Sequence, residues 1–135
     1  MEETMPESAI TDEFLSSLFP PGRADEFFEA LYGGAEAGAF DIGLRTAGFN
    51  KQNNTLIIEF VLTERPGHCM ACNLTYGLPQ VFQRHPIINL SGIIDEIDKK
   101  LKPDWSVEEW QIGSTQVLDP KVNTIPVFIK LKKNN

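Results

Sequence analysis

The chain has 135 residues, of which 41% are apolar, 23% are charged and 10% are aromatic. This length predicts a single domain, residues 1–135, and the apolar fraction is too high for a disordered chain. No apolar stretch approaches the roughly 20 residues of a membrane-spanning helix, and the acidic start is unlike a signal peptide. We therefore expect a soluble, cytoplasmic protein without a membrane partner.

The charge of the chain argues against a nucleic-acid partner. The formal net charge is −7, and the acidic excess lies in the first half of the chain. Such a surface repels phosphate backbones, so we expect no nucleic acid to bind. We interpret the three lysines near the C-terminus as the solvated end of a strand, which they protect from edge pairing: Lys130, Lys132 and Lys133.

The N-terminal third predicts a flexible tail and two helices. Residues 1–10 are polar and lack periodicity, so we expect them to be flexible. Thr11 can cap a short helix whose apolar side chains share one face, namely Phe14, Leu15 and Leu18. A second helix is expected over residues 23–32, ended by two glycines.

From residue 40 the apolar side chains recur at every second position, which predicts strands. The alternation covers residues 40–46, 55–63 and 70–78, and a polar turn at residues 50–54 separates the first two. These three segments are expected to form a meander. The middle one also carries Ile57 and Val61 on its second face, so we predict a central strand covered on both sides.

Residues 89–102 have the clearest helical pattern of the chain. Asn89 is a favourable N-cap residue. Three pairs of opposite charge are spaced i,i+4 along the outer face: Asp95/Lys99, Glu96/Lys100 and Asp98/Lys102. The apolar residues form one stripe that should face the core: Leu90, Ile93, Ile94, Ile97 and Leu101.

The last segment predicts a hairpin of two strands, residues 107–118 and 125–131. Pro126 has no amide donor, so the second strand should be bulged or lie at an edge there. The predicted order is therefore α-α-β-β-β-α-β-β. We expect a two-layer α+β fold, in which helices lie mainly on one face of an antiparallel five-stranded sheet.

The candidate functional residues cluster between the strong elements, in the segment 64–86. They are His68, Cys69, Cys72, Tyr76, Arg84 and His85. Zinc is one interpretation, because Cys69, Cys72, His68 and His85 are all suitable ligands. In a strand, however, Cys69 and Cys72 would point to opposite sides, which opposes chelation, so our expectation is no cofactor, with zinc as the alternative.

Thiol redox chemistry is a second interpretation of the same CxxC motif. A reactive CxxC normally precedes a helix, which stabilises the thiolate, whereas the pattern after Cys72 is that of a strand. Hydrolase, phosphate-loop and dinucleotide-binding motifs do not occur, which leaves enzymatic activity open but without a motif to support it.

A binding role is the third interpretation. Trp105 follows Pro103 and Asp104 in an expected loop, so its side chain is a candidate contact for a partner. An antiparallel sheet with one open face also favours pairing with a second copy of the chain or another protein. The sequence therefore predicts a binding or assembly module, and the alternative is a metal-binding or redox protein centred on Cys69 and Cys72.

Overall fold

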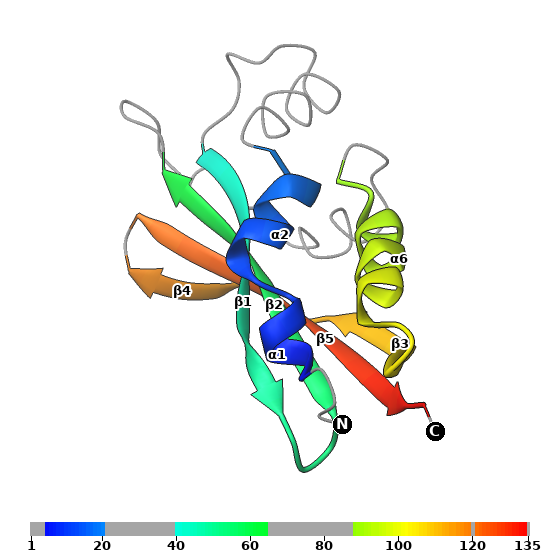
Figure 1. The fold of residues 1–135 in the computed structure, drawn as a ribbon. Coiled ribbons are helices and arrows are strands. Elements are labelled where there is room, and N and C mark those ends of the chain that lie inside the picture. The colour runs from blue at the N-terminus through cyan, green and yellow to red at the C-terminus, as the bar shows by residue number, and fades with distance from the viewer. Residues whose placement is uncertain (1–4, 21–39, 65–87, 120, 135) are drawn as a thin grey trace.

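The computed structural model of the protein describes residues 5–20, 40–64, 88–119 and 121–134. In this part of the chain, five strands form one antiparallel sheet, and helices lie on one of its faces (Figure 1). This arrangement confirms the predicted α+β fold. The helices are α1 (Pro6–Ala9), α2 (Asp12–Leu18) and α6 (Leu90–Leu101). The strands are β1 (Phe40–Asn50), β2 (Thr55–Glu64), β3 (Trp105–Ile112), β4 (Gln116–Asp119) and β5 (Val122–Lys133).

The strand order places β5 in the middle of the sheet. The order is β1-β2-β5-β3, and β4 pairs with the beginning of β5. β2 is therefore central, as predicted, with β1 and β5 as its two neighbours. The third predicted strand, residues 70–78, and the predicted helix over residues 23–32 lie outside the described residues. The predicted strand 107–118 is interrupted, so that it forms β3 and β4.

Cross-strand pairs show which side chains share a face of the sheet. On the face toward the helices, the pairs run across β1, β2 and β5, for example Leu44 with Phe60 and Phe60 with Ile125. This face and the apolar stripe of α6 form the core, and every one of these side chains is buried. The alternation predicted for β2 is confirmed, because these four residues have no exposed surface: Leu56, Ile58, Phe60 and Leu62.

The opposite face of the sheet differs from the prediction. Ile57 and Val61 of β2 lie there, together with Phe128 of β5, and all three side chains are half-buried. The described helices all contact the other face, so the expected cover over both sides of β2 is not found within the described residues.

Pro126 lies in the interior of the sheet and not at an edge. Its carbonyl accepts a hydrogen bond of 2.7 Å from the amide of Gly113, at the interruption between β3 and β4. In an antiparallel strand the N and C=O of one residue point to the same side. The nitrogen of Pro126, which carries no hydrogen, therefore points toward the interruption between β3 and β4. No strand carbonyl stands there to accept a hydrogen bond from it in the described part of the chain.

The N-terminal segment is more ordered than expected. Residues 6–9 form α1 and Ile10 has no exposed surface, so the predicted flexible tail does not extend through these residues. The predicted cap of α2 is confirmed, because the hydroxyl of Thr11 accepts a hydrogen bond of 3.1 Å from the amide of Phe14. None of the helices in the described ranges is long and apolar enough to cross a membrane.

The stripe of α6 and the position of its N-cap residue, Asn89, are confirmed, but the capping hydrogen bond is absent and the expected ion pairs form only in part. Asn89 has a left-handed backbone conformation and makes no capping hydrogen bond through its side chain. Of the three expected i,i+4 ion pairs only Asp98–Lys102 forms, at 3.3 Å, in the described part of the chain. Lys99 contacts Glu96 instead, and Lys100 lies over the ring of Phe14.

Candidate binding groove at the edge of the sheet

The structure leaves the sequence-predicted cluster untested. All six of its residues lie in the segment 65–87, outside the described residues: His68, Cys69, Cys72, Tyr76, Arg84 and His85. The zinc and redox interpretations therefore stay predictions. In the parts of the chain that are described, no group of three or more His, Cys, Asp or Glu side chains is placed to hold a metal ion.

Trp105 is not the exposed loop residue that the sequence predicted. It is the first residue of β3, and its side chain is only 5% exposed. Its ring meets that of Phe49 edge-on, with 5.8 Å between the ring centroids. Apolar neighbours thus cover the indole, so Trp105 belongs to the core and does not offer a contact surface to a partner.

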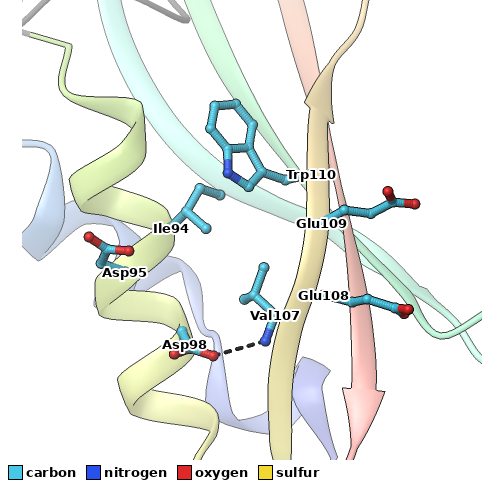
Figure 2. A pocket seen from close by; sticks show the side chains of 7 residues that line it. All are labelled: Ile94, Asp95, Asp98, Val107, Glu108, Glu109 and Trp110. Atoms are coloured by element: carbon cyan, nitrogen blue, oxygen red, sulfur yellow. Dashed lines mark hydrogen bonds between the residues drawn. The ribbon is translucent and has the colours of Figure 1, made fainter.

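A groove does exist a few residues further along, between α6 and β3 (Figure 2). It encloses about 460 Å³. Ile94 of α6 and the side chains of Val107 and Trp110 point toward each other across it, whereas Glu108 and Glu109 point away from α6. Asp95 and Asp98 complete the helix side. Val107 and Trp110 are only partly buried, so the groove has an apolar floor that the described residues do not fill.

The groove lies along an open edge of the sheet. β3 pairs with β5, and no other described strand lies beside it. The amide of Gly113 binds the carbonyl of Pro126, which shows that even-numbered residues of β5 point toward β3. By register, Glu109 and Gln111 face β5, so the N–H and C=O groups of Trp110 and Ile112 point outward. These groups have no hydrogen-bond partner in the described part of the chain.

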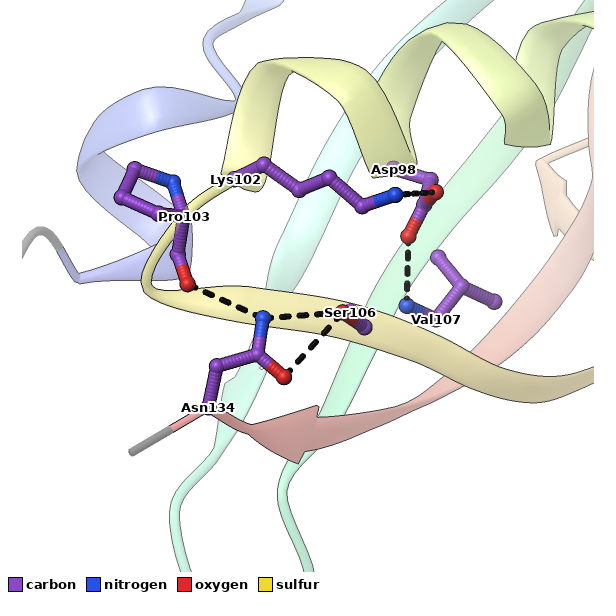
Figure 3. Close-up of polar contacts among 6 residues, drawn as sticks. All are labelled: Asp98, Lys102, Pro103, Ser106, Val107 and Asn134. Carbon is purple, nitrogen blue, oxygen red and sulfur yellow. Dashed lines mark hydrogen bonds and ion pairs between the residues drawn. The ribbon is translucent and has the colours of Figure 1, made fainter.

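Asp98 closes the other end of this edge. Its carboxylate accepts a hydrogen bond of 2.8 Å from the outward amide of Val107. Its second oxygen lies 3.3 Å from the ammonium group of Lys102 (Figure 3). The opposite edge of the sheet is closed in the same way, because Asp12 of α2 accepts a hydrogen bond of 2.8 Å from the amide of Thr46 in β1. Each edge strand is thus anchored to a helix by one aspartate.

A second set of contacts fixes the start of β3. The side-chain amide of Asn134 donates to the carbonyl of Pro103 at 2.9 Å and to the hydroxyl of Ser106 at 2.9 Å (Figure 3). The backbone amide of Asn134 also donates to the carbonyl of Asp104. Asn134, directly after β5, therefore holds the connection between α6 and β3 in place.

Replacing Asp98 by alanine should lower the free energy of unfolding by about 1–2 kcal/mol. The amide of Val107 would lose a charge-assisted hydrogen bond, whose value is reduced here by the partial exposure of the carboxylate. Urea unfolding measures the effect. Asp95→Ala, an exposed position on the same helix, is the control and should change stability by less than about 0.5 kcal/mol. Equal losses in the two variants would contradict this role of Asp98.

Another hollow lies on the opposite face of β3. It encloses about 250 Å³ and is lined by residues of three strands: Thr55, Glu109, Trp110, Gln111, Phe128 and Lys130. Because side chains of a strand alternate between faces, an additional strand beside β3 would direct its side chains toward the two hollows in turn. A third cavity, of about 280 Å³, lies between α2 and the other edge of the sheet.

The groove offers three kinds of binding contact. Its described lining consists of apolar side chains, carboxylates and backbone groups. No protein-family model matches the chain, and neither a curated protein nor a solved structure matches it. The described residues thus form an α+β fold in which β3, beside α6, is an edge strand with no further described strand next to it.

Sequence reasoning missed this groove because an edge is a property of the whole sheet. The predicted strand 107–118 contains Trp110 and Ile112, but only the strand order shows that β3 is the outermost of the described strands on its side of the sheet. The one local signal is the pair Glu108-Glu109, since charges and bulges are common on edge strands, and the register of β3 does shift between Val107 and Glu109.

Proposed function

We propose that the chain, as a single cytoplasmic domain, is a protein-binding module that receives an extended segment of a partner protein. The segment would add to the sheet as a further strand beside β3. One observation carries the proposal: the outward N–H and C=O groups of Trp110 and Ile112 lack partners in the described part of the chain, next to an unfilled apolar groove. Main-chain hydrogen bonds of this kind provide affinity, and the flanking pockets provide selectivity.

The neighbouring half of β3 supports this location. The outward amide of Val107 already donates its hydrogen bond to Asp98, and the register shift at Glu108 bends the strand. The first half of the edge is therefore protected from pairing with another strand. The protection stops before Trp110. A partner strand would therefore pair with residues 110–112, while its side chains on the helix side contact Ile94 and Trp110.

The proposal can be tested with a random library of displayed 12-residue peptides, selected against the full chain. Peptides enriched on the unmodified protein are then compared on Ile112→Pro and Ile112→Ala. Proline removes the outward N–H of residue 112, whereas alanine keeps that N–H and removes most of the same side chain. The amide of Gln111, which faces β5, is present in both variants.

We expect binding to fall about tenfold more in Ile112→Pro than in Ile112→Ala, which corresponds to about 1.4 kcal/mol for the lost hydrogen bond. Selection of no peptide above background, or equal affinities of the two variants, would overturn strand addition. The sequence also predicted a second copy of the chain as a partner, and sedimentation of the unmodified protein tests this prediction. A dimer that dissociates in Ile112→Pro would show that a second copy of the chain pairs with β3.

The metal or redox alternative rests on Cys69 and Cys72 and has its own test. Metal content and reactive thiols should be measured on the same untagged sample. From the strand pattern around Cys72 we expect no bound metal, one reactive thiol, and a second thiol that reacts only after unfolding. Stoichiometric zinc with both thiols masked would contradict this expectation and support a site formed with His68 and His85.

A further inference from the structure

The charges around the edge of β3 indicate what kind of segment would bind there. Four carboxylates belong to the groove lining, from Asp95, Asp98, Glu108 and Glu109. Lys102 neutralises Asp98 at 3.3 Å. Glu108 and Glu109 are exposed and form no ion pair in the described part of the chain, although Lys130 lies opposite Glu109 in the register. Among the described residues, Glu108 and Glu109 therefore place negative charge without an ion pair on the face away from α6, and Asp95 adds one such charge on the helix side.

The two faces of the edge differ in chemistry. Trp110, Ile112 and Val107 face the helix side, where each is partly buried against the core. Glu108 and Glu109 point away from α6 (Figure 2). A strand that pairs with β3 must present alternate side chains to these two faces. Opposite charges directly across neighbouring strands are stabilising, and like charges are destabilising.

We infer that the partner segment alternates apolar residues, toward Trp110 and α6, with lysine or arginine residues, toward Glu108 and Glu109. This inference rests on the proposed strand addition and adds the chemistry of the partner. The edge of β3 supplies the position of the segment, and the two glutamates, which form no ion pair among the described residues, select its charge. A basic segment would gain affinity from two kinds of contact. Its backbone would form hydrogen bonds at Trp110 and Ile112, and this pairing would bring its cations beside the two carboxylates.

Three synthetic peptides test the inference by NMR titration of the full chain: KVKVKVK, TVTVTVT and EVEVEVE. All three alternate valine with a second residue type, so the valine face is the same in all of them and the charge of the other face is positive, zero or negative. We expect KVKVKVK to bind about tenfold more tightly than TVTVTVT, EVEVEVE to bind least, and the largest shifts at the amides of Trp110 and Ile112. The advantage of KVKVKVK should shrink as salt is added.

Two double variants separate local charge from the charge of the whole protein. Glu108→Gln/Glu109→Gln should remove most of the preference for KVKVKVK over TVTVTVT. Glu7→Gln/Glu13→Gln removes the same number of charges from exposed positions on α1 and α2 and should keep the preference. A preference that survives the first double variant, or is lost in both, would overturn the inference.

The peptide series also separates failure of the inference from failure of the proposed function. Equal binding of KVKVKVK and TVTVTVT at Trp110 and Ile112 would leave strand addition in place and overturn the basic partner. Absence of shifts at these two amides with all three peptides would overturn the proposed function itself, and Glu108 and Glu109 would then serve only to protect the edge from pairing.

Discussion

Replacing Phe60 by alanine is expected to lower the free energy of unfolding by about 3–5 kcal/mol. Phe60 has no exposed surface, and it lies on β2 between the strands β1 and β5. Its ring meets that of Phe19, the residue directly after α2, edge-on with 5.7 Å between the ring centroids. The substitution therefore also removes this contact between β2 and the end of α2. Since domains of this size are stable by about 5–15 kcal/mol, this loss is a large share of the total.

Urea unfolding of matched variants checks the expectation. Phe60→Leu keeps most of the apolar volume and should lose about half as much as the alanine variant or less. Thr63→Ala lies on the same strand, on the exposed opposite face, and should change stability by less than about 0.5 kcal/mol. An alanine variant at position 60 no less stable than the leucine variant would show that this part of the core is not packed as described.

The sequence predicted those features that depend on neighbours along the chain. The alternation of β2, the stripe of α6 and the cap at Thr11 each arise from residues within a few positions of one another, and all three are confirmed. Burying apolar residues on one face requires the observed period in any fold of this class. For that reason the elements and the core could be predicted without knowing how the strands are ordered.

The strand order could not be predicted in this way. β5 lies beside β2 although about 60 residues separate Thr63 from Val122, with which it pairs. This pairing makes Pro126 a central residue and leaves β3 at the edge. The alternation of each strand is compatible with several orders, because it specifies which face is buried and not which strand lies alongside.

The candidate site depends on this nonlocal information more than the core does. Asp98 fits the pattern of a solvated helix face with an i,i+4 lysine, and that ion pair does form. Its bond to the amide of Val107 required the placement of α6 against β3, which no spacing in the sequence encodes. The same placement turns Trp110 from an ordinary strand residue into the floor of a groove.

Trp105 shows most clearly how the environment of a residue can differ from what its neighbours along the chain predict. Proline and aspartate before it are typical of a loop, which is why an exposed anchor was expected there. In the structure, β3 starts at Trp105, two residues earlier than predicted, because Asn134 donates hydrogen bonds to the carbonyls of Pro103 and Asp104 and so fixes the end of the connection after α6. Trp105 then points to the same face as Val107 and is covered by apolar neighbours such as Phe49.

Replacing Trp105 by alanine should therefore cost about 3–5 kcal/mol, as expected for a buried tryptophan. Trp110→Ala is the matched control on the same strand, where the indole is only partly buried, and it should cost less than about half of that. In peptide binding the order of the two variants should be reversed, with the larger loss of affinity in Trp110→Ala. At a temperature where Trp105→Ala is folded, it should retain peptide affinity, whereas Trp110→Ala should lose it. A Trp105→Ala variant as stable as the unmodified protein would restore the exposed anchor and contradict its place in the core.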